Sequence, residues 1–367
     1  MGTCLHCGKS SPVISARIGF CVSCIRDHSG EVLPRLEEVH RESRRVFGLP
    51  EVPPRAENGL PCNLCFHRCR IPEGERGYCG VWRNERGRLR GPGVEAARVS
   101  WYLDPLPTNC VADFVCAGGQ GAGFPRWAYR PGPEYGYFNL AVFYEACNFN
   151  CLYCQNWHFR RGGRRRSSEE MLADLRPEVS CVCYFGGDPG PQAPHALSFS
   201  RRAIREARGR ILRICWETNG GENPKILRQM MELSLATGGT LKVDLKAWSP
   251  AVHRALCGVS NQAVLENFRL LSAMIAARPE PPPLVASTLL VPGYVDEEEL
   301  RGLARFLAEL NPEIPWSLLA FHPDFMLTDL PTTSRDHAAL ALEIARSAGL
   351  KRVHLGNRHL LSEAYTV

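Results

Sequence analysis

The sequence lacks three features that would place a protein in a membrane, outside the cell or on nucleic acid. Its apolar runs are all interrupted well before the roughly 20 residues that a membrane-spanning helix needs. It does not open with a basic segment followed by an apolar run, as a secretory signal does. The formal net charge of +6 over 367 residues is mild, and no basic stripe carries aromatic residues beside it. We therefore expect a soluble cytoplasmic protein with no membrane partner, whereas nucleic acid stays an open partner class.

Cysteine is the residue that the sequence has in excess, with 17 copies. Clustered cysteines in a reducing compartment are more often metal ligands than disulfides. Eleven of these cysteines fall into three groups along the chain. The first group is Cys4, Cys7, Cys21 and Cys24; the second is Cys62, Cys65, Cys69 and Cys79; the third is Cys147, Cys151 and Cys154. Each group predicts a metal site.

Two further features have more than one interpretation. Cys110 and Cys116 could approach an active site or an auxiliary metal, or could be buried core thiols. The densest positive run, residues 160–166, holds five arginines and two glycines. It could be a solvated loop, or a contact for an anionic substrate or partner.

Composition shifts along the chain divide it into four parts. We expect a zinc-ribbon-like module at 1–30, a charged helix with a Gly/Pro-rich linker at 31–57, a cysteine-rich segment at 58–135 and the main domain at 136–367. The helix should be solvent-exposed over 25–47. Residues 91–135 are rich in Gly and Pro with little periodicity, so we expect irregular structure there.

The main domain alternates short apolar runs with helical periodicity. The runs, expected as buried strands, are 139–145, 180–185, 211–216, 240–245, 284–291 and 315–320, with a seventh short strand at 351–355. Helical patterns cover 300–310 and a capped segment from Ser334 to Gly349. Such alternation predicts a parallel sheet with right-handed crossovers and an active site at the carboxyl ends of the strands. The fold class expected is α/β, a partial six-stranded barrel with cysteine-rich N-terminal extensions.

The third cysteine group follows the first of these strands as Cys147-Asn-Phe-Asn-Cys151-Leu-Tyr153-Cys154. Four-iron clusters usually take four cysteines. Three ligands on one loop would leave one iron free to bind something else. The alternatives are an incomplete zinc site and a cluster whose fourth ligand comes from elsewhere.

The spacing C-x3-C-x2-C, with an aromatic residue before the last cysteine, resembles the signature of the radical S-adenosylmethionine (SAM) superfamily. The resemblance implies a [4Fe-4S] cluster whose free iron binds SAM. It also implies reductive cleavage of SAM to a 5′-deoxyadenosyl radical, which abstracts hydrogen from a substrate. Such a radical SAM oxidoreductase needs an electron donor such as flavodoxin or ferredoxin.

The segment Gly186-Gly187-Asp188 follows the second strand and resembles that family's Gly-Gly-Glu motif. In the family, the backbone and the acid of this motif contact the SAM amino group. The departure here is Asp for Glu. The resemblance also places Tyr153, beside the last cysteine of the loop, among the cofactor-binding residues.

The next two strand ends resemble the pyruvate formate-lyase activating enzyme subgroup. They carry Glu217-Thr218-Asn219 after the third strand, and Asp244-Leu-Lys246 at the end of the fourth. The resemblance implies a monovalent cation beside the SAM carboxylate and a SAM contact through Lys246. Glu217 replaces the Asp of the best-known member. The other interpretation of Asp244 and Lys246 is an ordinary ion pair at a strand end.

The second cysteine group precedes Gly80-Val-Trp82 and resembles the radical SAM component of the AmmeMemoRadiSam group. Its four thiols could hold zinc or a second iron–sulfur cluster. The first group has paired knuckles at zinc-ribbon spacing, which predicts zinc.

Three functions follow from these motifs. The subgroup resemblance favours an activase that makes a glycyl radical on a partner enzyme. The second hypothesis is direct radical modification of a small molecule, RNA or protein side chain. The third is a non-catalytic, metal-stapled binding module.

Overall fold

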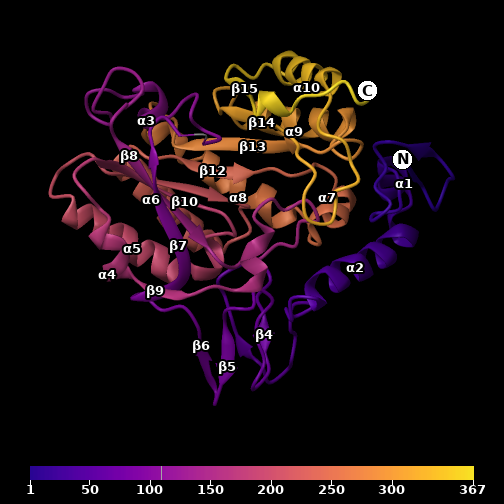
Figure 1. Ribbon diagram of the computed structural model, residues 1–367, viewed down its shortest axis with the longest axis horizontal. Coiled ribbons are helices and arrows are strands. Elements are labelled where there is room, and N and C mark those ends of the chain that lie inside the picture. Colours follow the sequence, from indigo (N-terminus) through magenta and orange to yellow (C-terminus); the bar gives the residue numbers. More distant parts are fainter. Residues whose placement is uncertain (109) are drawn as a thin grey trace.

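The computed structural model describes residues 1–108 and 110–367. Its centre is a nine-stranded sheet in the order β15-β14-β13-β12-β11-β10-β8-β7-β9 (Figure 1). Seven neighbouring strands pair in parallel: β8 Phe138–Tyr144, β10 Val179–Phe185, β11 Arg213–Thr218, β12 Leu241–Asp244, β13 Leu284–Leu290, β14 Trp316–Ala320 and β15 Val353–Gly356. In the described part of the chain, β9 and β15 do not pair with each other, so the barrel is open. The predicted partial α/β barrel and its strands are confirmed.

Two antiparallel strands extend the sheet at its β8 edge. β7 (Ala96–Pro105) pairs with β8, and the short β9 (Arg165–Ser167) pairs with β7. The prediction of irregular structure over 91–135 is therefore wrong for β7. Along this strand Ala97 and Val99 are buried while Arg98 and Ser100 are exposed. Because only one face is covered, β7 lacks the continuous apolar run that marked the central strands. A short helix, α3 (Ala117–Gln120), follows in the same region.

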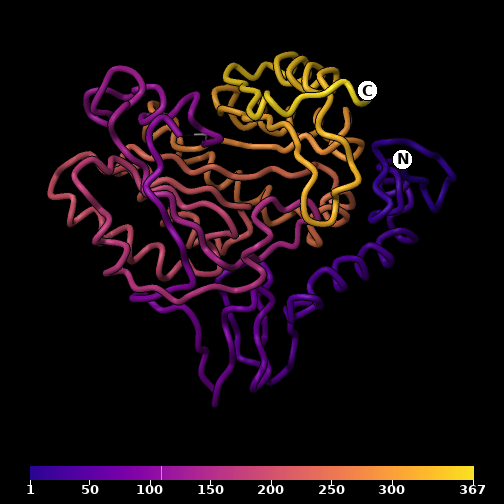
Figure 2. Tube along the Cα trace, in the orientation of Figure 1, coloured from indigo at the N-terminus to yellow at the C-terminus, as the bar shows by residue number. Residues whose placement is uncertain are grey.

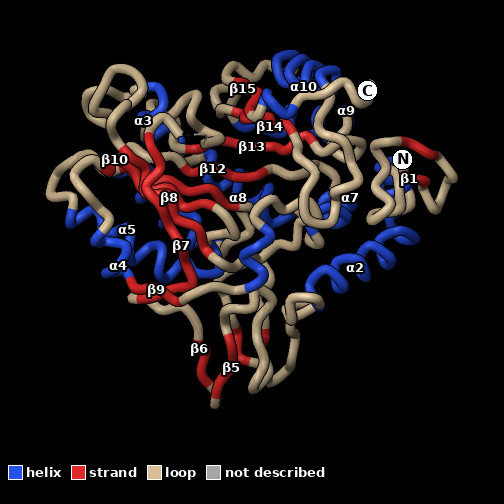
Figure 3. Tube along the Cα trace, viewed as in Figure 1, coloured by secondary structure: helices blue, strands red, loops and turns tan. Residues whose placement is uncertain are grey.

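Helices flank the sheet along its length (Figure 3). They are α4 Ser168–Ala173, α5 Ala193–Glu206, α6 Pro224–Thr237, α7 Pro250–Cys257, α8 Gln262–Ser272, α9 Glu297–Leu310 and α10 Arg335–Ser347. The two predicted caps hold: Ser334 accepts a hydrogen bond from the His337 amide (3.1 Å) at the start of α10, and Gly349 follows its end. α9 buries Leu300, Leu303 and Leu307 against the sheet.

The N-terminal module, here called the ribbon (residues 1–27), packs on the outside of the barrel. It contains the paired strands β1 (Gly2–Thr3) and β2 (Ser10–Ser11) and the helix α1 (Val22–Asp27). Arg26 forms ion pairs with Asp296 (2.6 Å) and Glu299 (3.0 Å) at the start of α9. Figure 2 shows this first segment of the chain beside the C-terminal part. The ribbon is therefore anchored to the rim of the barrel.

The charged segment over 25–47 was predicted to be one solvent-exposed helix, and this prediction is wrong. A break at His28 separates α1 from α2 (Ser29–Arg45), and α2 buries Val32, Leu36 and His40. The Nε2–H of His40 donates to the Ala255 carbonyl (3.0 Å) of α7. α2 thus lies half-buried against the barrel. The prediction of an exposed helix was made from its many charged residues.

The second cysteine group lies in a segment here called the wedge (residues 58–92). It consists of two small hairpins, β3 (Leu60–Pro61) with β4 (Arg70–Ile71), and β5 (Arg83–Glu85) with β6 (Arg88–Arg90), which project from the sheet (Figure 1). Its inner end is tied to the barrel by backbone hydrogen bonds from Phe66 to Gly221 (3.0 Å) and from Asn223 to Leu64 (2.9 Å).

Candidate active site

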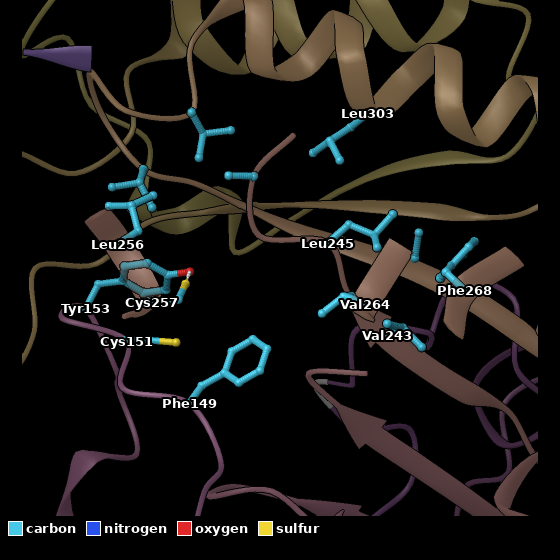
Figure 4. Packing of buried hydrophobic residues seen from close by; sticks show 14 of the residues in the cluster. Phe149, Cys151, Tyr153, Val243, Leu245, Leu256, Cys257, Val264, Phe268 and Leu303 are labelled. Atoms are coloured by element: carbon cyan, nitrogen blue, oxygen red, sulfur yellow. Dashed lines mark hydrogen bonds between the residues drawn. The ribbon is translucent and has the colours of Figure 1, made fainter. Parts of the chain in front are cut away.

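The loop after β8 carries the three cysteines of the third group. Its backbone is held by α7, because Asn150 and Leu152 donate to the carbonyls of Cys257 (3.0 Å) and Leu256 (2.9 Å). The Tyr153 hydroxyl lies 3.6 Å from the Cys257 sulfur, with Cys151 alongside (Figure 4). The loop is therefore clamped at the end of a helix, and its three thiols line one pocket.

All residues predicted to contact SAM line the same pocket. Beside the three cysteines it is lined by Tyr153, Gly186, Gly187, Asp188, Glu217, Thr218, Asn219, Asp244 and Lys246. These side chains come from the ends of β8, β10, β11 and β12, which are neighbours in the sheet. The rule that ligand sites lie at the carboxyl ends of parallel strands accounts for this convergence.

The glycine pair is required by packing. Gly187 has φ +65°, and a Cβ there would lie 1.9 Å from the Tyr144 carbonyl oxygen. A Cβ on Gly186 would lie 2.4 Å from the Phe143 ring. The two glycines let the loop after β10 approach the end of β8, where the Asp188 amide donates to the Ala146 carbonyl (2.8 Å).

The Asp188 carboxylate is buried, and both of its oxygens accept hydrogen bonds. Its carboxylate accepts from the amides of Gly190 (2.8 Å) and Asn219 (2.8 Å) and from the Thr218 hydroxyl (3.1 Å). Burial raises the pKa of Asp188, and these hydrogen bonds oppose the rise. The shorter acid therefore links the loop after β10 to the end of β11, at the wall of the pocket.

Glu222 is a functional candidate that the sequence analysis missed. A carboxyl oxygen of Glu222 lies 2.5 Å from the Thr218 hydroxyl, whose single proton is shared with the Asp188 carboxylate, and burial together with the neighbouring Asp188 raises the pKa of Glu222 well above the usual value. Two carboxyl groups this close share a proton readily. The available signal was an acid directly after Gly220-Gly221, at the end of a predicted strand.

The three residues predicted to hold a monovalent cation each have a different partner. Glu217 pairs with Lys242 (3.2 Å), Thr218 faces Asp188, and Asp244 pairs with Lys246 (2.6 Å). The cation site therefore stays a prediction. Although burial alone would lower the pKa of Lys246, the Asp244 carboxylate raises it well above the ordinary value. Lys246 is thus a partly buried, charged ammonium at the pocket wall.

Cys110 lies beside this site. Its sulfur is 3.0 Å from the Lys242 ammonium and 3.5 Å from a Glu217 carboxylate oxygen. Cys116 lies elsewhere, as the N-cap of α3, where it accepts from the Gly119 amide (3.2 Å). The sequence left the roles of Cys110 and Cys116 undecided, and Cys110 is therefore the one at the edge of the active site.

Two buried arginines near the cluster loop bear on whether the loop could hold an anionic cluster. Arg160 is 4% exposed; one of its nitrogens donates to Asn150 (2.5 Å), while Nε and Nη2 find no partner among the described residues. Arg44 is 1% exposed and stacks on the Tyr78 ring at 3.5 Å, and it donates to the Pro50 carbonyl (2.6 Å). Within residues 1–108 and 110–367, neither guanidinium has a carboxylate partner.

A buried guanidinium without a counter-charge is costly, and arginine cannot shed its proton. Burial raises the pKa of Cys154 to about 11, and the charge of Arg160 opposes this rise. Iron–sulfur clusters are held by thiolates and carry negative charge on their ligands. A cluster on the loop of Cys147, Cys151 and Cys154 would supply the missing counter-charge, so the residues present fit the group.

Residues between the wedge cysteines contact this loop. His67, between Cys65 and Cys69, hydrogen-bonds the Asn148 carbonyl (2.7 Å). The neighbouring Phe66 ring meets Phe149 edge-on, with centroids 5.8 Å apart. The second and third cysteine groups are thus connected by residues that lie between the cysteines of each group.

Sulfur spacing separates the ribbon from the wedge. The ligand atoms of Cys4, Cys7, Cys21 and Cys24 all lie within 4.8 Å of one another. Tetrahedral zinc with bonds of about 2.3 Å places its sulfurs about 3.8 Å apart, which this group fits. Among the described residues, the wedge cysteines do not converge to this degree. Burial raises the pKa of Cys79 to about 12, so a metal would be needed to ionise it.

Comparison with known proteins identifies the class. Residues 141–307 match the family model of the radical SAM superfamily, so this part of the chain is a radical SAM domain. It is similar to an uncharacterized protein of Methanocaldococcus jannaschii, with 25% identity over 308 residues that cover 82% of each chain.

Two named relatives are activating enzymes. The isethionate sulfite-lyase activating enzyme of Oleidesulfovibrio alaskensis is 33% identical over 142 residues, 38% of this chain and 41% of that enzyme. The pyruvate formate-lyase-activating enzyme of Streptococcus mutans is 25% identical over 50% of this chain and 71% of that one. The match to the former thus spans less than half of its length. Among the described residues, no helix is both long and apolar enough to cross a membrane.

Proposed function

We propose that the protein is a radical SAM oxidoreductase that cleaves SAM reductively at a [4Fe-4S] cluster held by Cys147, Cys151 and Cys154, and abstracts hydrogen from a substrate. The observation that carries this proposal is the single pocket shared by these thiols and the ends of four neighbouring strands. The cluster and SAM supply the radical chemistry when bound.

The chain's own residues bind and orient SAM in this proposal. The Lys246 ammonium, partly buried beside Asp244, suits the SAM carboxylate because charge-assisted hydrogen bonds are stronger than neutral ones. The Asn219 side chain donates to Asn148 (2.6 Å) and lies 3.6 Å from the Cys147 sulfur, so it fixes the first cysteine of the loop. Tyr153, packed on Cys257, fixes the second and third.

The substrate we favour is a glycyl radical enzyme, since the named relatives are activating enzymes of that kind. Direct modification of a small molecule, RNA or protein side chain is the second candidate. We further propose zinc in the ribbon, supported by its sulfur spacing, and a second iron–sulfur cluster in the wedge, supported by its contact with the loop at Asn148.

Two experiments test the proposal in order. The anaerobically reconstituted protein is first given SAM and dithionite; 5′-deoxyadenosine should form, and its absence would leave only the binding-module hypothesis. The protein is then incubated with an isethionate sulfite-lyase or a pyruvate formate-lyase. A doublet in the electron paramagnetic resonance (EPR) spectrum of the partner supports activation. The Cys151→Ala variant is the negative control, and a partner with its glycine changed to alanine should give no doublet.

A further inference from the structure

Positive charge is concentrated in two segments of the chain. Residues 55–98 hold nine arginines against five glutamates, and residues 160–166 hold five arginines and no acid. Since the whole chain has a net charge of only +6, the remainder is net acidic. This asymmetry gives the protein one strongly basic region.

The two segments meet in one groove of about 1020 Å³, here called the arginine groove. It runs between the wedge, the end of α2 and the β7–β9 edge of the sheet. The arginines that line it are Arg45, Arg76, Arg83, Arg90, Arg98 and Arg165. Within the described residues Arg45 and Arg83 are paired with glutamates, whereas Arg90, Arg98 and Arg165 are exposed and form no ion pair. Their charge is available to a partner.

The groove lies beside the cysteines of the wedge. Gly80 and Val81, which directly follow Cys79, are part of its lining, and so is Gly163 from the arginine-rich loop after Cys154. The wedge in turn contacts the cluster loop through His67 and Asn148 (2.7 Å). A molecule seated in the groove would therefore be next to one cysteine group and connected through it to the other.

The lining also indicates the kind of partner. It contains no aromatic side chain, whereas proteins that bind single-stranded nucleic acid stack bases on aromatic rings. Its six arginines outnumber Glu51, Glu75 and Glu85, and arginine is a residue enriched at interfaces between proteins. Complementary charge mainly raises the rate at which such partners meet.

We propose that the arginine groove docks a small acidic one-electron carrier protein that reduces the iron–sulfur centres, with the electron entering at the wedge. The inference rests on the proposed radical SAM function. In the step, one electron leaves the reduced carrier, which becomes oxidised, and one cluster is reduced by that electron; no bond forms or breaks. Weak redox encounters of this type use small, charge-guided interfaces.

The test measures the rate of cluster reduction in the reconstituted protein by stopped flow. The reductant is either an acidic reduced flavodoxin or an uncharged photoreduced deazaflavin. In the variant Arg90→Glu/Arg98→Glu/Arg165→Glu we expect the rate with flavodoxin to fall at least tenfold and to lose its dependence on salt. The rate with deazaflavin should not change.

The matched control is Arg205→Glu/Arg228→Glu/Arg346→Glu, which changes the net charge equally on exposed helix surfaces. It should keep the wild-type rate with flavodoxin. An equal loss in both variants, or no loss in the groove variant, would overturn the proposal. So would an oligonucleotide that binds the groove while flavodoxin still reduces the clusters at full rate. If deazaflavin reduces no cluster even in the wild type, the proposed function itself fails.

Discussion

The ribbon and the wedge each offer four cysteines, yet they differ in the spacing of the sulfurs and in their place on the barrel. In the ribbon the four sulfurs converge within 4.8 Å, and the module is attached to the outer rim of the barrel through Arg26. In the wedge the sulfurs are less convergent, and the segment between Cys65 and Cys69 contacts the cluster loop directly. Place and sulfur spacing, and not cysteine count, therefore distinguish the proposed zinc site in the ribbon from the proposed second cluster in the wedge.

The largest effect is expected from a variant that changes neither the ribbon nor the wedge but removes one cysteine of the cluster loop. In Cys151→Ala we expect 5′-deoxyadenosine formation to fall to background, because the remaining two thiols cannot hold the cluster. The ribbon should keep its zinc. The measurement is product chromatography beside metal analysis of the same sample. SAM cleavage that persists in this variant would show that the cluster is held elsewhere.

Removing a wedge cysteine tests whether the second group holds iron. Cys69→Ala should lose one cluster's complement of iron and sulfide and retain the zinc of the ribbon. Because the wedge contacts the loop at Asn148, the remaining cluster should be reduced more slowly by flavodoxin. Iron, sulfide and zinc analysis checks the first point, with Cys116→Ala as a matched control outside both groups. Loss of zinc with iron intact would assign zinc to the wedge.

Removing zinc from the ribbon should have a smaller and local effect. Cys7→Ser should lose the ribbon's metal, and a segment this short cannot hold a core without one. We expect faster proteolysis within residues 1–27, while the cluster content and the melting temperature of the barrel change little. Limited proteolysis followed by mass spectrometry makes the comparison. A ribbon as resistant as that of the wild type would contradict the role of a staple.

The smallest expected effect concerns the buried charge beside the loop. Arg160→Met removes a positive charge that stabilises the reduced, more negative cluster. Its reduction equilibrium constant should fall about tenfold, which is about 59 mV for one electron. Redox titration followed by EPR measures the shift. Arg160→Lys should restore the potential, and Arg161→Met, on the exposed side of the same turn, should leave it unchanged. Equal potentials in all four proteins would show that Arg160 does not stabilise the reduced cluster.

The sequence was sufficient for the central sheet because its strands are buried on both faces and form continuous apolar runs. It was insufficient for β7, whose alternation is covered on one face only. The pocket residues could be predicted since each follows a predicted strand. Glu222, Arg44 and Arg160 could not, because their importance lies in their burial, and this depends on how segments far apart in the chain pack together.

The central claim is that the loop of Cys147, Cys151 and Cys154 holds a cluster with one iron open to SAM. The most direct test is the EPR spectrum of the reduced, reconstituted protein before and after addition of SAM. The account predicts that SAM changes the spectrum of one cluster, and that this SAM-sensitive signal is missing in Cys151→Ala. A spectrum that SAM leaves unchanged, in protein that contains the full complement of iron, would contradict it.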